Sequence, residues 1–107
     1  MKLLKIFILC SMSISAAVHS SENLNHLRLD PGFKISIFAN NLDSPRQMAE
    51  GDNGTVFLGQ RSGTILALLD SDRNGEVDSK RVIADNLTYS TGVSIYNGDL
   101  YFSEISK

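Results

Sequence analysis

The chain has 107 residues, of which 42% are hydrophobic and 21% are charged, and its formal net charge is −2. This composition is typical of a globular protein and excludes disordered and collagen-like classes. The weakly acidic balance and the scattered basic residues exclude a surface that binds nucleic acid through its phosphates, so we predict no nucleic-acid partner.

The first twenty residues have the layout of a secretory signal peptide. Lys2 and Lys5 flank a short apolar run, Leu3 to Cys10, and residues rich in Ser and Ala follow it. The run is well short of the about 20 residues that a membrane span needs. We therefore predict that residues 1–20 are a signal peptide, cleaved after Ala17 or Ser20. The protein would then be exported, periplasmic or secreted, with no membrane span.

The residues after this leader read as an arm followed by an all-β fold. Residues 21–32 form the polar arm, and from Phe33 onward short β-branched or aromatic segments alternate with turn residues. Asp52-Asn53-Gly54 and Asn97-Gly98 are suited to tight β-turns. The expected strands are Lys34–Ala39, Gln47–Glu50, Thr55–Gln60, Thr64–Leu69, Lys80–Ala84, Gly92–Tyr96 and Asp99–Ser103.

An internal repeat indicates how these strands are organised. Phe38-Ala-Asn-Asn-Leu42 recurs as Ile83-Ala-Asp-Asn-Leu87, and Asn53 to Gln60 resembles Asn97 to Glu104 at an offset of 44 residues. A period of about 40–50 residues that carries four short strands is typical of a β-propeller blade. The sequence therefore predicts an all-β propeller.

The repeat also assigns a role to each strand. Residues 47–84 form one whole blade, and residues 92–103 begin a second. Lys34–Ala39 matches the fourth strand of a blade, where it would close the ring against the last blade. Since even the smallest propellers need about four blades, we expect residues 33–107 to be an incomplete propeller: a closing strand, blade 1 and the start of blade 2.

One loop concentrates oxygen ligands. Its pattern D-x-D-x-N-G-x-x-D supplies carboxylate and amide oxygens around a sharp turn at Gly75, and Ca²⁺ prefers six to eight such oxygens. The alternative is an acidic surface hairpin in which Asp and Asn serve as turn formers. We predict a stabilising Ca²⁺ site formed by Asp70, Asp72, Asn74, Glu76 and Asp78. Glu76 would act through its backbone carbonyl.

No catalytic residue is assigned within this chain. The two histidines, His19 and His26, lie in or beside the leader and in the arm, so neither is placed to act as a base. Several carboxylates lie near turns or strand ends, where a solvated surface role is expected: Asp30, Asp43, Glu50, Asp52, Asp85 and Glu104.

The motifs Pro31-Gly-Phe33-Lys-Ile35, Pro45-Arg46, Asp52-Asn-Gly54-Thr-Val56-Phe57 and Asp99-Leu-Tyr101 resemble the opening of the soluble quinone-dependent sugar dehydrogenases. This glucose/sorbosone dehydrogenase family consists of six-bladed propellers that bind pyrroloquinoline quinone (PQQ). The resemblance implies an exported oxidoreductase that oxidises a sugar or a related alcohol or aldehyde. The family's catalytic and quinone-binding residues lie mainly in later blades, so none is carried over and this stretch alone is expected to be inactive.

Two other interpretations stay open. A calcium-loaded propeller could serve as a non-enzymatic interaction module that binds a partner or glycan. A degraded gene could also encode a product that never folds. Later blades with a His and several basic residues facing the channel would favour the dehydrogenase over the interaction module.

Overall fold

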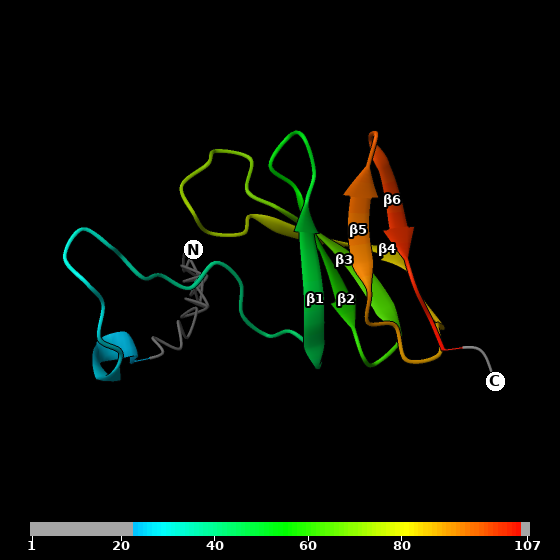
Figure 1. Ribbon diagram of the computed structural model, residues 1–107, viewed down its shortest axis with the longest axis horizontal. Helices are drawn as coiled ribbons and strands as arrows, with labels where there is room; N and C mark the ends of the chain where they lie inside the picture. The colour runs from blue at the N-terminus through cyan, green and yellow to red at the C-terminus, as the bar shows by residue number, and fades with distance from the viewer. Residues whose placement is uncertain (1–22, 106–107) are drawn as a thin grey trace, which may run out of the picture.

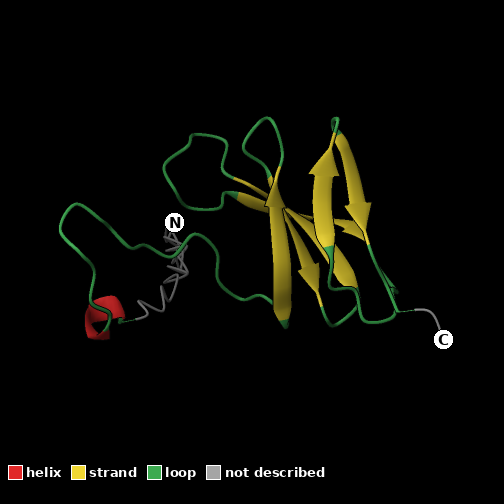
Figure 2. Ribbon diagram, in the orientation of Figure 1, coloured by secondary structure: helices red, strands yellow, loops and turns green. Residues whose placement is uncertain are grey.

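A computed structural model of the chain describes residues 23–105 (Figure 1). Six strands carry almost all of the regular structure, and one 3₁₀ turn precedes them (Figure 2). The elements are η1 (Leu24–His26), β1 (Pro45–Glu50), β2 (Val56–Gln60), β3 (Thr64–Leu69), β4 (Ser79–Ala84), β5 (Val93–Tyr96) and β6 (Asp99–Phe102).

The first four strands form one antiparallel sheet in the order β1-β2-β3-β4. Each strand pairs with the next along the chain, so short turns or loops make every connection. The expected bounds are confirmed for β3 and differ by one or two residues at one end of each of the other five strands. Alternating apolar residues and turn residues thus predict this sheet well, because both signals are local.

The last two strands form a separate antiparallel hairpin, β5-β6. Its turn is Asn97-Gly98, where φ is 50° and 82°, as a tight hairpin turn with positive φ at both central residues requires. Gly54, in the longer turn between β1 and β2, has the same φ of 82°. The two hairpins predicted to be related by sequence therefore share a glycine with left-handed backbone in their turns.

The β5-β6 hairpin packs on one face of the four-stranded sheet, closest to β1 and β2. Gly59 allows the approach, because a Cβ atom there would lie 2.9 Å from the Thr91 carbonyl oxygen and from a methyl group of Val93. Phe57, two residues earlier on the same face, lines a recess with Ile95 and Leu100. Small and apolar residues thus bring the two sheets face to face.

A second segment covers the opposite face of the sheet. This covering segment, residues 38–44, is tied to the start of β4 by the Val77 N–H, which donates to the Phe38 carbonyl at 2.9 Å. At its other end the Arg61 N–H donates to the Ser44 carbonyl at 2.9 Å. The described chain therefore has three layers, with the four-stranded sheet between the covering segment and the hairpin (Figure 1).

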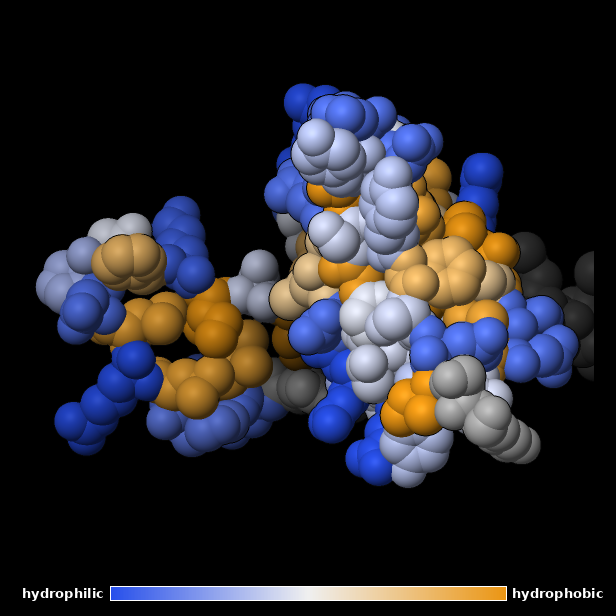
Figure 3. Space-filling view, turned by 45° about the vertical axis from the view of Figure 1, so that its right-hand side comes forward, coloured by the Kyte–Doolittle hydropathy of each residue, from blue (hydrophilic) through white to orange (hydrophobic). Residues whose placement is uncertain are grey.

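The core lies in the two central strands of the sheet. Ile65 is completely buried, and Leu58, Ala67 and Leu68 are at most 5% exposed. The residues of the edge strands β1 and β4 are mainly exposed. The core is consequently narrow, and large apolar side chains remain on the surface (Figure 3).

One expected strand is absent from the described residues. Residues 34–39 have no strand partner and lie outside both sheets, so the prediction of a strand at Lys34–Ala39 is wrong for this structure. The reason is physical: a strand is defined by its pairing, and an alternating pattern does not supply a partner. In the polar arm, the structure adds the 3₁₀ turn η1, where the Asn25 N–H donates to Asn23 Oδ1 at 3.0 Å.

The all-β prediction is confirmed by the described strands. The predicted signal peptide, its cleavage sites and Cys10 lie outside the described residues. Within residues 23–105, no helix has the length and apolar character needed to cross a membrane.

Candidate metal-binding loop

The acidic loop joins β3 to β4 and is closed at its base by the sheet itself. The Asp78 N–H donates to the carbonyl of Leu69 at 2.8 Å, which extends the β3–β4 pairing into the loop. Within the loop, Gly75 has φ 90° and Arg73 has φ 56°, so the chain turns sharply twice. The nine residues 70–78 therefore fold back on themselves and bring their two ends together.

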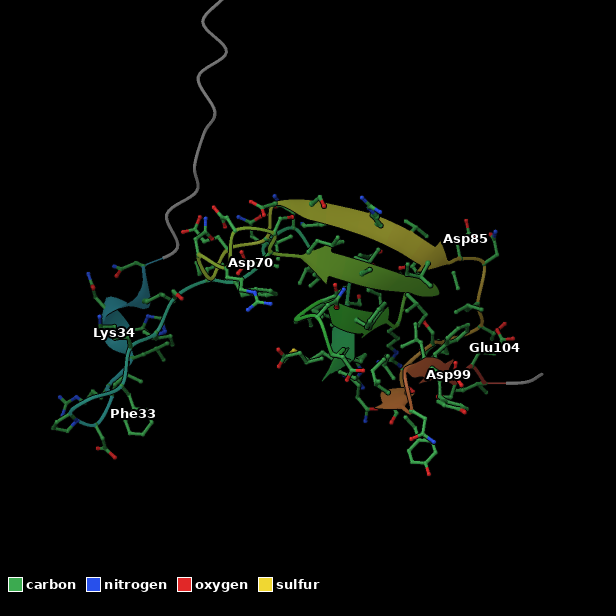
Figure 4. All side chains as sticks on the ribbon, turned by 90° about the horizontal axis from the view of Figure 1, so that it is seen from above. Phe33, Lys34, Asp70, Asp85, Asp99 and Glu104 are labelled. Atoms are coloured by element: carbon green, nitrogen blue, oxygen red, sulfur yellow. The ribbon has the colours of Figure 1, made fainter. Side chains whose placement is uncertain are left out.

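Three of the five predicted ligands meet in this loop. Asp70, Asp72 and Asp78 each present a carboxylate oxygen, and these oxygens lie within 4.8 Å of one another. Asp70 is half-buried at the end of β3, whereas the other two are exposed. Figure 4 shows Asp70 at the base of the loop, next to the sheet. The spacing read from the sequence thus places three carboxylates around one point.

Backbone N–H groups fix the first of these carboxylates. Asp70 accepts from the Gly75 N–H at 2.9 Å and from the Asn74 N–H at 3.1 Å. Asp78 accepts from the Ser71 N–H at 2.6 Å. These bonds hold the carboxylates in place from inside the loop, and each carboxylate retains lone pairs for another partner.

The other two predicted ligands lie in the same loop and are held there by hydrogen bonds. Asn74 donates from Nδ2 to Asp72 at 3.1 Å, and its Oδ1 accepts from the Glu76 N–H at 2.8 Å. An amide oxygen has two lone pairs, so Asn74 Oδ1 keeps one for a cation, and its ligand role stays a prediction. Glu76 is exposed and is joined to the loop through its N–H. The ligand role of the Glu76 carbonyl stays a prediction.

The donor set suits a hard cation. Three carboxylates supply the charge and the oxygen atoms that Ca²⁺ prefers, and a loop open to solvent leaves room for water molecules as further ligands. Three like charges at this separation repel one another, so a divalent cation between them would remove that repulsion. Asp70, Asp72 and Asp78 fit such an ion, with Asn74 as the residue that orients Asp72.

A recess beside the loop contains residues that the sequence did not single out as a group. Glu50 and Asp52, from the end of β1 and its turn, line it together with Asp70, Arg73 and Phe38. From the sequence, Glu50 and Asp52 were expected only as solvated residues near a turn. Their position follows from the meander, because the β1–β2 turn and the β3–β4 loop lie at the same end of the sheet.

A buried polar cluster that no sequence motif predicts lies at the other end of the sheet. The Ser90 hydroxyl is completely buried and lies 2.7 Å from the Gln60 carbonyl oxygen and 3.2 Å from the Thr64 carbonyl oxygen. Thr64 in turn donates from its hydroxyl to Gln60 Oε1 at 2.6 Å. Because Ser90 precedes β5, this cluster connects the first sheet to the hairpin.

An exposed pair flanks that cluster. Arg61 donates to the Tyr89 hydroxyl at 2.6 Å, and its guanidinium carbon lies 4.3 Å from the centre of the Tyr89 ring. A cation over an aromatic ring adds a modest attraction at an exposed site. The pair therefore reinforces the same junction between the β2–β3 turn and the segment before β5.

The remaining ionisable candidates are on the surface. Glu104 accepts from the Thr88 N–H at 2.8 Å, and Figure 4 shows Asp85 and Glu104 on the strand and loop ends where the sequence placed them. His26 is exposed in the arm, where its Nδ1 contacts the Asn23 carbonyl oxygen at 2.9 Å. The expected exposed positions are confirmed for Asp30, Asp43, Glu50, Asp52, Asp85 and Glu104.

The calcium prediction has a direct thermal test. Adding Ca²⁺ at about 100 times its dissociation constant should stabilise the fold by about 2.7 kcal/mol, because the ion binds the folded loop alone. The double variant Asp70→Asn, Asp72→Asn should lose this response, since it removes two of the three charges. Melting curves recorded in Ca²⁺ and in EDTA measure both effects.

The matched control is Asp85→Asn, which neutralises an exposed carboxylate outside the loop. This variant should respond to Ca²⁺ as the unchanged chain does. Equal melting temperatures in Ca²⁺ and EDTA for the unchanged chain would show that the loop is an acidic hairpin without an ion.

The comparisons with known proteins give one similar sequence. An uncharacterized protein of Borreliella burgdorferi (strain ATCC 35210 / DSM 4680 / CIP 102532 / B31) is 30% identical over 103 residues, which cover 95% of this chain. The chain spans about a quarter, 24%, of the length of that relative. No protein-family description and no solved structure matches the chain.

Proposed function

We propose that this chain is the N-terminal part of an exported β-propeller of the glucose/sorbosone dehydrogenase type. In this proposal, β1–β4 are blade 1 and β5-β6 begin blade 2. Residues 34–39 would supply the closing strand, paired with a strand that lies outside this chain. The acidic loop would hold a Ca²⁺ ion that stabilises blade 1.

The observation that carries the proposal is the packing of a second hairpin on a four-stranded antiparallel meander. A propeller repeats such four-stranded sheets around an axis, each packed on the next. Here β5-β6 follows β1-β2 at an offset of about 44 residues and packs on the same sheet through Gly59. The length of the Borreliella burgdorferi relative also leaves room for further blades.

The activity of the whole protein rests on the motif resemblance set out above. A sugar, alcohol or aldehyde substrate would be oxidised with PQQ as the bound cofactor, which takes up the two electrons. The described residues would provide the scaffold for this activity: the polar arm, one blade and the acidic loop. The quinone-binding and proton-accepting groups are expected in later blades.

The test uses the longest polypeptide that contains this chain, purified with Ca²⁺ and PQQ. Reduction of an electron-acceptor dye that depends on both PQQ and an added aldose is the expected result. The 107-residue chain, assayed in parallel, should show no reduction. A folded long polypeptide that gives no PQQ-dependent reduction with sugars, alcohols or aldehydes would refute the dehydrogenase proposal.

The runner-up is a non-enzymatic, calcium-binding propeller that interacts with a partner or glycan. The observation in its favour is the carboxylate cluster of Asp70, Asp72 and Asp78, which one loop of this chain supplies without residues from later blades. This alternative predicts Ca²⁺-dependent stability without dye reduction. The two measurements, melting and dye reduction, thus separate the two functions.

A further inference from the structure

We infer that Asn97, in the turn between β5 and β6, is a site of spontaneous deamidation in the folded protein, where it converts to aspartate and isoaspartate. The reaction needs only water as a co-reactant. The inference concerns the turn itself and does not depend on the dehydrogenase activity proposed above.

The described chain contains three steps at which a glycine follows an asparagine: Asn53-Gly54, Asn74-Gly75 and Asn97-Gly98. Asparagine is a thermolabile residue, and a following glycine leaves the attacking backbone nitrogen unhindered because it has no side chain. All three asparagines are exposed, so access to water does not distinguish them. Their hydrogen bonds do.

The reaction at Asn97 begins when the Gly98 nitrogen attacks the side-chain carbonyl carbon, Cγ. A bond forms between this nitrogen and Cγ, the Cγ–Nδ2 bond breaks, and ammonia leaves with the proton of the Gly98 N–H. Water then opens the cyclic imide at one of its two carbonyl groups, which gives aspartate or isoaspartate. The reaction therefore requires a free Gly98 nitrogen and a side-chain amide that can rotate toward it.

The first Asn-Gly step is restrained at both reacting groups. The Gly54 N–H donates to the Gly51 carbonyl at 3.0 Å, so the attacking nitrogen is engaged. Asn53 Oδ1 accepts from the Thr55 N–H at 3.1 Å, which holds the side-chain amide away from that nitrogen. Attack at Asn53 would have to break both bonds.

The second step, in the acidic loop, is restrained more strongly. The Gly75 N–H donates to the Asp70 carboxylate at 2.9 Å. Asn74 Oδ1 accepts from the Glu76 N–H at 2.8 Å, and its Nδ2 donates to Asp72 at 3.1 Å. The geometry that gathers the carboxylates thus also protects Asn74.

The third step lacks these restraints. Within residues 23–105, neither the Gly98 N–H nor the Asn97 side chain has a hydrogen-bond partner. A two-residue turn pairs its flanking residues, here Tyr96 and Asp99, and leaves the N–H of its second central residue free. Asn97 has φ 50°, a conformation that costs free energy for a residue with a side chain, so rotation out of it relieves strain.

The exposure of this turn follows from its place at the end of a hairpin. The corresponding turn of the first sheet, residues 52–54, is exposed although β5-β6 packs on that sheet. Figure 1 shows both turns at the same end of the molecule, where strands reverse direction. A further sheet packed on the face of the hairpin would likewise leave Asn97 accessible.

The products should loosen the end of the hairpin. Isoaspartate adds one methylene group to the backbone of a turn that has only two central residues. Both products also place a new carboxylate two positions from Asp99. The pairing of Tyr96 with Asp99 should weaken, so amide exchange at these two residues should accelerate as the reaction proceeds.

The decisive experiment follows deamidation in the folded 107-residue chain and in the same chain unfolded in guanidinium chloride. Trypsin separates the three steps into peptides 47–61, 74–80 and 82–107, and fragment mass spectra distinguish Asn97 from Asn86 in the last peptide. In the folded chain, Asn97 should convert at least about tenfold faster than the other two, because each of those must break two or more hydrogen bonds. In guanidinium chloride the three rates should agree within about threefold, because these bonds are lost.

Asn97→Gly is the matched control, because two glycines form the same type of turn. This variant should show no conversion at position 97, and its amide exchange at Tyr96 and Asp99 should stay constant during the incubation. In the unchanged chain, exchange at these residues should accelerate in step with the conversion of Asn97. Circular dichroism should show the same β-sheet content in both proteins before incubation.

Three results would overturn the inference. Asn53 or Asn74 could convert as fast as Asn97 in the folded chain, the ratio of the three rates could be unchanged in guanidinium chloride, or Asn97 could fail to convert. The longest polypeptide that contains this chain should show the same order of rates. None of these measurements depends on PQQ-dependent dye reduction, so a failure here leaves the proposed function standing.

Discussion

Replacing Gly63 with alanine is expected to lower the free energy of unfolding by about 2–5 kcal/mol. Gly63 is buried in the β2–β3 turn with φ 105°, a backbone conformation that an L side chain rarely adopts. A Cβ atom there would lie 2.3 Å from the Leu87 carbonyl oxygen. This oxygen belongs to the backbone, so it cannot move aside as the end of a flexible side chain could. The turn or the segment before β5 would have to move.

The same glycine also accepts a hydrogen bond that the movement would break. The Leu87 N–H donates to the Gly63 carbonyl at 3.0 Å, so the two segments are joined where the added methyl group would separate them. Urea unfolding of the 107-residue chain measures the free energy. Amide exchange should accelerate around residues 85–92 as well.

Gly98→Ala is the matched control. Gly98 has φ 82°, but a Cβ atom there would have no neighbour within 4 Å. This variant therefore carries the backbone strain without the collision and should cost about 1–2 kcal/mol. Equal losses in Gly63→Ala and Gly98→Ala would contradict this prediction, because the collision with Leu87 would then add no cost to the backbone strain.

The sequence predicted the local part of this fold well. Strand β3 has the expected bounds, Thr64–Leu69, because a β-branched start, apolar residues and flanking turn residues all lie within a few positions of one another. The acidic loop brought Asp70, Asp72 and Asp78 together for the same reason. In both cases the signal and the structure span fewer than ten residues.

What the sequence could not predict depends on residues that are distant along the chain. Lys34–Ala39 has the alternation of a strand, yet alternation specifies a face and not a partner, so the segment is unpaired here. The close approach at Gly63 depends on where Leu87 lies, 24 residues further along the chain. Ser90 stands in a run of polar residues that gave no sign of complete burial.

These distant contacts share one location, the junction between the first sheet and the segment before β5. The two glycines, Gly59 and Gly63, allow close approach there because they have no side chain. Ser90 joins the two segments through its buried hydroxyl. A junction of this kind determines how closely one sheet packs on the next. In a propeller it would set the angle between successive blades, so its residues bear on the proposed function more than the exposed carboxylates do.

Replacing Ser90 with alanine tests that junction without adding bulk. The Ser90 hydroxyl has two carbonyl oxygens within hydrogen-bond distance, those of Gln60 and Thr64, and it has no exposed surface. Its loss should cost about 1–3 kcal/mol, because buried acceptors lose their donor where water is excluded. The Gln60 carbonyl also accepts from the Gly63 N–H at 2.9 Å, which keeps the cost toward the lower end of this range.

The pattern of the loss distinguishes a junction from a general core contact. Amide exchange in β5 and β6 should accelerate more than exchange in β3, because the hydroxyl joins the hairpin to a sheet that retains its own pairing. Ser94→Ala is the matched control, an exposed serine on β5 whose change should alter stability by less than about 0.5 kcal/mol. If Ser90→Ala accelerated exchange equally in β3 and in the hairpin, the two sheets would unfold as one unit and Ser90 would stabilise the whole rather than the junction.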